Sequence, residues 1–296
     1  MTMVILNDQP QEKIKPDWPD LIRRSLAGNR EVLDQLLASL QPFVFNLAQK
    51  MLLNPDDAAD ATQEILLKVV LGLQTYDANK AKFTTWAYAI ARNQLLKFRT
   101  GKIEALTGSF DQFAEEIHAV ADEVIEAREL QNPETQLLVK EANVGCMLGM
   151  LLCLTREQRM VFILGEFFSL KSDVAGEICG VSSENYRQQL SRARKDLYSF
   201  MHNKCGLVNK ANPCRCHRKT RGFIKAGYVD PQNIRFAAHH YKNARIFSEE
   251  HADAMCDLDD EYGQLFRRLP AYDAGRALLT VQNLLNNEQF KDTFKV

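Results

Sequence analysis

The sequence of 296 residues contains no apolar run near the roughly 20 residues that a membrane-spanning helix needs. Its first residues, MTMVILNDQPQEK, lack the basic start and apolar stretch of a signal peptide, so we expect a cytoplasmic protein. With 14 glycines and 9 prolines it is neither collagen-like nor of low complexity. It also lacks a glycine-rich phosphate loop, a Ser/His/Asp set and a pair of catalytic carboxylates, and we therefore do not expect an enzyme.

Net charge is nearly absent as well, at −1, but the charges are segregated along the chain. From Glu104 to Glu134 there are nine acidic residues and one basic residue. From Arg187 to Lys225 there are eleven basic residues and one acidic residue. A basic segment of this kind indicates a polyanionic partner.

Apolar residues recur at helical spacing almost throughout, which predicts an all-α fold. Changes in composition divide the chain into a helical domain over 17–101, an acidic linker over 102–133, a second helical domain over 134–201, and an extension over 202–296. The extension begins with a Cys-rich knot over 202–218 and ends in terminal helices. Helix breaks are expected near Gly28-Asn29 and Pro42, and the segment Asn54-Pro55-Asp56 is expected to supply a cap for the helix from Asp57. In the linker we expect only a weak helix, around 115–130.

The segment 170–197 has the pattern of a helix-turn-helix. A first helix over 172–179 ends at Gly180, which tolerates the left-handed conformation, and Ser182 or Ser183 caps a second helix. The outward face of the second helix suits base and phosphate contacts in a major groove. The predicted DNA-binding residues are Ser183, Glu184, Arg187, Gln188, Ser191, Arg192 and Lys195, with Arg194 on the same face. The alternative is an αα-hairpin with a solvated basic face.

Aromatic and basic residues are mixed in a helix expected over 82–99. Aromatic rings stack on unpaired bases while cations neutralise phosphates, so this composition suits a nucleic acid strand. We expect Phe83 and Trp86 to belong to the core. Nucleic acid contacts are assigned to Tyr88, Arg92, Asn93, Lys97 and Arg99.

The helix before it, expected from Asp57 to about Leu73, has an acidic face formed by Asp57, Asp60, Gln63 and Glu64. Because an acidic stripe would repel DNA, this face predicts a protein-binding surface. A solvated acidic face is the alternative.

Taken in order, these segments resemble a bacterial RNA polymerase sigma factor of the extracytoplasmic-function (ECF) type. The matching residues are Asp57-Ala58, Asp60 and Gln63-Glu64, then Phe83, Trp86 and Ile90-Ala91-Arg92-Asn93, and finally Leu154, Gln158-Arg159 and Ser191-Arg192-Ala193-Arg194. The resemblance covers about 17–202.

The resemblance implies a sigma factor that binds core RNA polymerase through the acidic helix and directs promoter-specific transcription initiation. It implies that the aromatic helix recognises and helps melt the minus-ten element and that the helix-turn-helix reads the minus-thirty-five element of promoter DNA. The acidic linker would pass through the polymerase cleft, and an anti-sigma factor would be a further partner. A stand-alone helix-turn-helix transcriptional regulator is the alternative, although it would need neither the acidic nor the aromatic helix.

The extension opens with His202, Cys205, Cys214 and Cys216, three thiols and an imidazole that could hold a structural zinc ion. Free thiols in a basic loop, or a redox or iron–sulfur role, are the alternatives. We expect Cys146 and two further helical cysteines to be core residues. The basic residues from 204 to 225 are expected to steady upstream DNA, with the terminal helices folding back on the sigma core or the polymerase.

Overall fold

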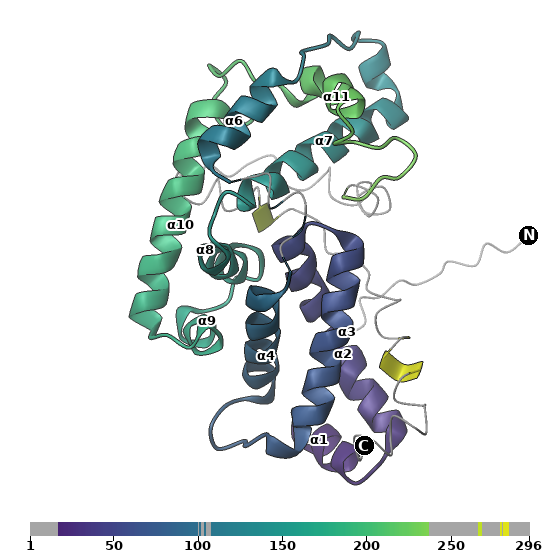
Figure 1. The fold of residues 1–296 in the computed structure, drawn as a ribbon, viewed down its shortest axis with the longest axis vertical. Helices are drawn as coiled ribbons and strands as arrows, with labels where there is room; N and C mark the ends of the chain where they lie inside the picture. Colours follow the sequence, from purple (N-terminus) through teal and green to yellow (C-terminus); the bar gives the residue numbers. More distant parts are fainter. Residues whose placement is uncertain are drawn as a thin grey trace, which may run out of the picture.

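The computed structural model describes residues 17–99, 101, 104, 108–236, 266–267, 279 and 281–283. Within these residues all regular structure is helical, which confirms the all-α prediction (Figure 1). No helix in the described part of the chain is long and apolar enough to cross a membrane. The terminal helices predicted for the extension lie outside the described residues except for short pieces.

Four helices build the first helical unit, in the lower half of Figure 1: α1 (Trp18–Leu26), α2 (Arg30–Leu52), α3 (Pro55–Gly72) and α4 (Phe83–Lys97). The predicted cap of α3 is confirmed, because Asn54 Oδ1 accepts from the backbone N–H groups of Asp56 and Asp57 at 2.9 and 3.2 Å. The chain also breaks after α1 as expected, with Gly28 at φ +86°.

The break predicted at Pro42 is wrong, since α2 continues through it. An interior proline costs a helix about 3 kcal/mol, because it lacks an N–H and crowds the preceding turn. Here tertiary packing offsets that cost: the last turns of α2, from Val44 to Leu52, are buried almost without interruption. The side chain of Asn46 also donates to the Pro42 carbonyl at 2.8 Å.

The linker contains a helix earlier than predicted. Helix α6 (Phe110–Ala119) starts at a Ser109 cap and ends at Ala119, and a short 3₁₀ turn, η2 (Glu129–Gln131), follows. The expected helix around 115–130 is therefore wrong for its second half. The reason is tertiary: Phe110 and Phe113 anchor α6 on Phe200 with ring centroids 5.1 and 6.0 Å apart, whereas 120–128 contains no helix.

The second unit comprises α7 (Pro133–Leu151), α8 (Arg156–Phe162), the π-helical turn η3 (Ile163–Phe167), α9 (Ser172–Cys179) and α10 (Ser183–Lys204). Helix α11 (Cys216–Lys225) belongs to the extension. The knot predicted over 202–218 is shorter than expected, since only 205–215 lacks helix. Asn209 and Asn212 cap the end of α10 by donating to the His202 carbonyl at 3.2 and 2.8 Å.

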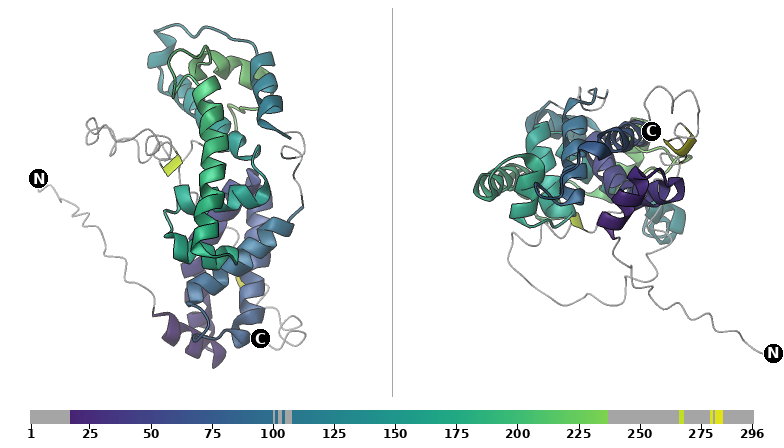
Figure 2. Two further views of the ribbon diagram at one scale, coloured as in Figure 1. Left: turned by 90° about the vertical axis from the view of Figure 1, so that its left-hand side faces the viewer. Right: turned by 90° about the horizontal axis from the view of Figure 1, so that it is seen from below.

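The two helical units share one buried core in this structure. Residues of α2, α3 and α4 pack in the same apolar cluster as residues of α7 to α10. Arg159 of α8, 1% exposed, ties the units by donating to Met51 O of α2 at 2.7 Å and to Leu151 O at 2.9 Å. Helix α10 runs along the molecule and links α9 with the end formed by α6, α7 and α11 (Figures 1 and 2).

Candidate nucleic-acid and polymerase interfaces

The helix-turn-helix forms as predicted. Helix α9 has the predicted bounds, Gly180 adopts a left-handed φ of +69°, and Ser182 rather than Ser183 caps α10 by accepting from Asn185 N–H at 3.1 Å. Tyr186 anchors the inward face: it is 1% exposed and donates its hydroxyl hydrogen to Val161 O at 2.8 Å. The opposite face of α10 is thereby turned outward.

Six of the seven predicted DNA-binding residues of α10 are exposed: Glu184, Arg187, Gln188, Ser191, Arg192 and Lys195. Ser183 is half-buried. Arg194 is a correction, because it does not join this face; its Nε donates to Glu166 Oε1 of η3 at 2.7 Å, and Glu166 is 1% exposed. A buried carboxylate needs a charge partner, and Arg194 supplies one.

The aromatic residues of α4 belong mainly to the core. Phe83 is 2% exposed, and Trp86 packs between it and Tyr76, with ring centroids 5.6 and 5.5 Å away. Tyr88 stacks on Phe43, with ring centroids 3.7 Å apart and the planes 16° from parallel. Burial raises the pKa of Tyr88 to about 12. Phe43 therefore covers one face of Tyr88, and a base could stack there only after Phe43 moved.

The polar residues assigned to DNA on α4 lie near its outer surface. Asn93 and Lys97 are exposed, and Arg92 donates to Asn93 Oδ1 at 2.8 Å. Arg92 also lines an open pocket of about 390 Å³ together with Gln189 and Arg192 of α10. Helix α4 packs against α9. Residues of both predicted DNA-binding helices, α4 and α10, thus line one cleft, which contains two arginines and Glu157.

The acidic face of α3 is tied to the end of α4. Asp60 and Glu64 are exposed and Gln63 is half-buried, whereas Asp57 forms an ion pair with Arg99. The charge of Asp57, a predicted polymerase contact, is therefore neutralised by Arg99, a predicted DNA contact. Asp60 and Glu64 carry most of the accessible negative charge of this face.

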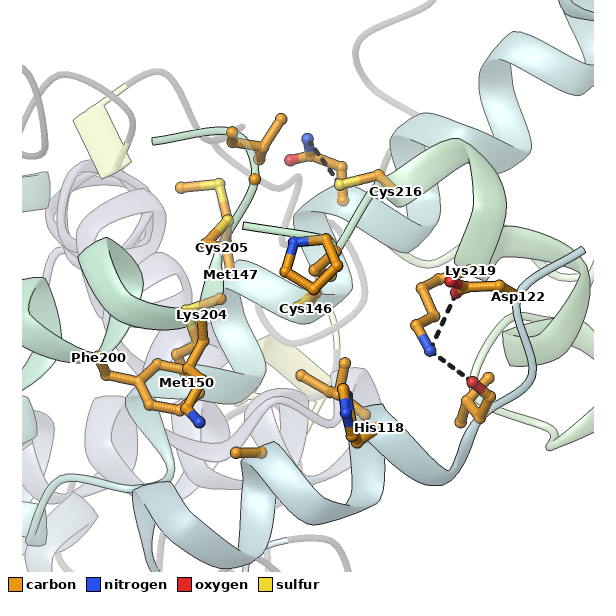
Figure 3. A pocket seen from close by; sticks show the side chains of 18 of the residues that line it. His118, Asp122, Cys146, Met147, Met150, Phe200, Lys204, Cys205, Cys216 and Lys219 are labelled. Carbon is orange, nitrogen blue, oxygen red and sulfur yellow. Dashed lines mark hydrogen bonds and ion pairs between the residues drawn. The ribbon is translucent and has the colours of Figure 1, made fainter. Parts of the chain in front are cut away.

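Four cysteines line a single cavity of about 500 Å³ between α6, α7 and the end of α10 (Figure 3). They are Cys205, Cys214 and Cys216 from the predicted zinc set, together with Cys146, which was expected to be a core residue. His202 is not among the lining residues. Burial raises the pKa of Cys216 to about 12 and raises the pKa of Cys146 well above its ordinary value, so these thiols are neutral.

Within the described residues, no three His, Cys, Asp or Glu side chains are arranged so that they could hold a metal ion as they stand. Zinc binding therefore stays a prediction. Sequence reasoning missed Cys146 because its neighbours on α7 are apolar, and only the folding of the knot against α7 reveals its place.

The comparisons with known proteins match the two helical units separately. The family model of Sigma-70 region 2 matches residues 36–102, and that of Sigma-70 region 4 matches residues 145–197. The extracytoplasmic-function (ECF) RNA polymerase sigma factor SigE of Mycolicibacterium smegmatis is 25% identical over 173 residues, which are 57% of this chain and 61% of SigE. The chain thus matches less than two thirds of that relative's length.

A second relative, the ECF RNA polymerase sigma factor SigW of Bacillus subtilis, is 23% identical over 181 residues, 60% of this chain and 92% of SigW. A solved structure of the sigma factor RpoE in complex with the anti-sigma factor NepR, from Bartonella quintana, is 19% identical with a TM-score of 0.35, covering 56% of this chain and 94% of RpoE. Both helical units thus match sigma-factor regions, in the order that sigma factors have them. Residues 36–102 and 145–197 thus match Sigma-70 regions 2 and 4, and the chain is similar to RNA polymerase sigma factors of the extracytoplasmic-function type.

Proposed function

We propose that the chain binds core RNA polymerase and directs it to promoters as a dissociable specificity subunit without catalytic activity of its own. Helix α10 reads the minus-thirty-five element, and α4 with the turn before it engages the minus-ten element. The acidic face of α3 docks on the polymerase, and the linker over 102–133 enters its cleft. An anti-sigma factor is a further proposed partner.

The exposed face of α10 is the observation that carries this proposal. Six polar residues stand together there, whereas another cation of α10, Arg194, pairs with the buried Glu166. A solvated αα-hairpin would need no such separation of surface from structural cations. Bidentate Arg contacts to guanine and Gln contacts to adenine fit the residues on this face.

Because α4 packs against α9, the proposed function requires a change in the arrangement of the two helical units. Arg92 and Arg192 line the same cleft, so the two predicted recognition surfaces lie close together in this arrangement. The two promoter elements are read at separate places, and we therefore expect the two units to move apart when the chain engages polymerase. A stand-alone regulator would use only α9 and α10 and would not require this step.

Reconstitution with core RNA polymerase and a promoter library tests the proposal. We expect core-dependent initiation at a restricted set of promoters. Reversing the charge of Asp60 and Glu64 together should weaken core binding roughly tenfold, because a complementary charged surface is lost. Glu31→Lys, which reverses an exposed acid of α2, serves as the control. Initiation that does not depend on core, or core affinity unchanged by the double reversal, would count against the proposal.

A further inference from the structure

Helix α11 of the extension lies against the linker, 102 residues earlier in the chain (Figure 1). The backbone N–H of Glu123 donates to Arg218 O at 2.8 Å. Lys219 donates to Val120 O and lies 3.0 Å from Asp122 Oδ1, as the dashed lines in Figure 3 show. Only 7% of the Lys219 side chain is exposed. Lys219 is thus a buried cation whose hydrogen-bond acceptor and counter-ion both come from the linker.

Two exposed cations extend the contact along α11. Arg221 Nη2 lies 2.9 and 3.0 Å from the two carboxylate oxygens of Glu129, and its Nη1 donates to Val124 O at 3.1 Å. Lys225 forms an ion pair with Glu123. One helical face therefore binds both the acidic side chains and the backbone carbonyls of an extended segment, 120–129.

Close packing completes the contact. A Cβ atom at Gly222 would come within 2.5 Å of both Ala121 O and Val120 Cγ1, so glycine allows the linker backbone to approach α11. Beside it, Phe223 packs with Ala142 of α7 in a small apolar cluster to which Val120 also contributes. Charge, hydrogen bonds and steric fit thus all match the surface of α11 to the linker segment 120–129.

We propose that α11 is a docking surface for the linker, and that this latch, formed by Lys219, Arg221, Gly222 and Lys225 with residues 120–129, must open before the linker engages another partner. Three of the cations expected to contact upstream DNA, Lys219, Arg221 and Lys225, are paired with the chain's own acidic residues. Opening the latch therefore releases an acidic segment and a basic helix together. The consequence for polymerase rests on the proposed function, whereas the latch itself does not.

Hydrogen–deuterium exchange over 120–129 in the full chain tests the latch, because exchange reports how often a hydrogen-bonded segment opens. Arg221→Glu should speed exchange there by roughly tenfold, since it replaces an attractive pair with a repulsive one. Adding Glu129→Arg restores the pair with its charges exchanged and should slow exchange again. Lys210→Glu makes the same change of charge in the exposed turn before α11 and should have no effect.

Gly222→Ala opens the latch without changing charge. Alanine favours a helix more than glycine does, so a gain in linker exchange cannot come from weakening α11 itself. Unchanged exchange of 120–129 in both Arg221→Glu and Gly222→Ala would overturn the latch.

Core polymerase affinity, measured on the same variants, tests the consequence. Both open variants should bind core several-fold more tightly than the wild type, and the charge-exchanged pair should return to the wild-type affinity. Faster exchange with unchanged core affinity would overturn the competition between latch and polymerase. If no variant bound core, the wild type included, the proposed function would fail while the exchange data still decided the latch.

Discussion

Arg156 donates two parallel hydrogen bonds to Glu104, from Nε to Oε1 at 2.9 Å and from Nη2 to Oε2 at 2.5 Å. Arg159 joins the pair, with its Nη1 3.0 Å from Glu104 Oε1. Arg156 also donates to the last carbonyls of α4, Leu95 O and Leu96 O, at 3.4 Å. Arg156 of α8 thus binds both the start of the linker and the end of α4.

Removing this carboxylate should destabilise the whole chain. The side chain of Glu104 is 10% exposed and that of Arg159 is 2% exposed, so Glu104→Ala leaves a buried guanidinium without its counter-ion. We expect a loss of about 3 kcal/mol in the free energy of unfolding, measured by urea denaturation. Glu157→Ala removes an exposed acid beside Arg156 and should cost far less; equal losses in the two variants would contradict a buried pair.

The same site predicts how stability depends on pH in acid. Burial acts to raise the pKa of Glu104, but the hydrogen bonds and charges of Arg156 and Arg159 outweigh it and hold the pKa below the ordinary value of 4.5. A carboxyl whose pKa is lowered on folding stabilises the protein above its unfolded pKa. The unfolding free energy should therefore fall as pH drops below 4.5, and less steeply in Glu104→Gln. Denaturation curves from pH 3 to 6 would check this.

Two neighbouring arginines of α10 should separate DNA binding from stability. Arg192→Ala should leave the melting temperature unchanged and weaken promoter binding, by about 1–3 kcal/mol at one base pair if it reads a base. Arg194→Ala should lower the melting temperature, because the buried Glu166 loses one of its two arginine partners and keeps only Arg267. Thermal denaturation and binding to a panel of promoter variants test these two roles. A lower melting temperature in Arg192→Ala, or weaker promoter binding with unchanged melting temperature in Arg194→Ala, would contradict them.

Lys50 should make the protein more stable in mild alkali. It is 4% exposed, with Nζ 5.3 Å from the centre of the Phe167 ring, and burial lowers its pKa to about 8 from 10.5. A base with a lowered pKa binds fewer protons when folded, so unfolding free energy should rise between pH 8 and 10.5. Lys50→Met should remove that rise and add about 1–2 kcal/mol at pH 7. The exposed Lys97→Met is the control.

Zinc binding can be tested with the cavity cysteines. Metal binding must displace thiol protons, and because the Cys216 pKa is about 12, apparent affinity should increase with pH. If zinc gathers these thiols, Cys214→Ser and Cys146→Ser should each abolish binding, and His202→Ala should not. Metal content after zinc titration measures this, and a wild-type chain that retains no zinc at pH 8 would contradict the prediction.

Local signals in the sequence predicted the parts of the fold that depend on neighbouring residues. Gly180 and Ser182 act within one turn of the chain, and Asn54 caps the helix that it precedes, so these features were readable from the sequence. Pro42 misled for the opposite reason: its local cost is outweighed by burial of α2 against distant helices. The bounds of α6 depend likewise on Phe200, far along the chain.

The residues of the candidate site also differ in whether the local sequence could predict their roles. Helical periodicity correctly placed Arg192 on the outward face of α10, but an angle around a helix cannot show that Arg194 reaches Glu166 in another element. Charge segregation signalled that the linker and the extension have opposite sign. It did not show that the two bind each other, because that pairing depends on how Gly222 lets the chains approach.

Lys225 follows Glu123 by 102 residues, so during translation the linker is synthesised before the helix that covers it. A ribosome adds about 5–20 residues per second, so α11 is made roughly 5–20 s after the linker. During that interval the nascent chain already contains α1 to α4 and α6, but α11 is not yet present to cover the acidic segment. A partner of the linker that is present during translation would meet it uncovered, whereas the same partner must open the latch in every finished molecule.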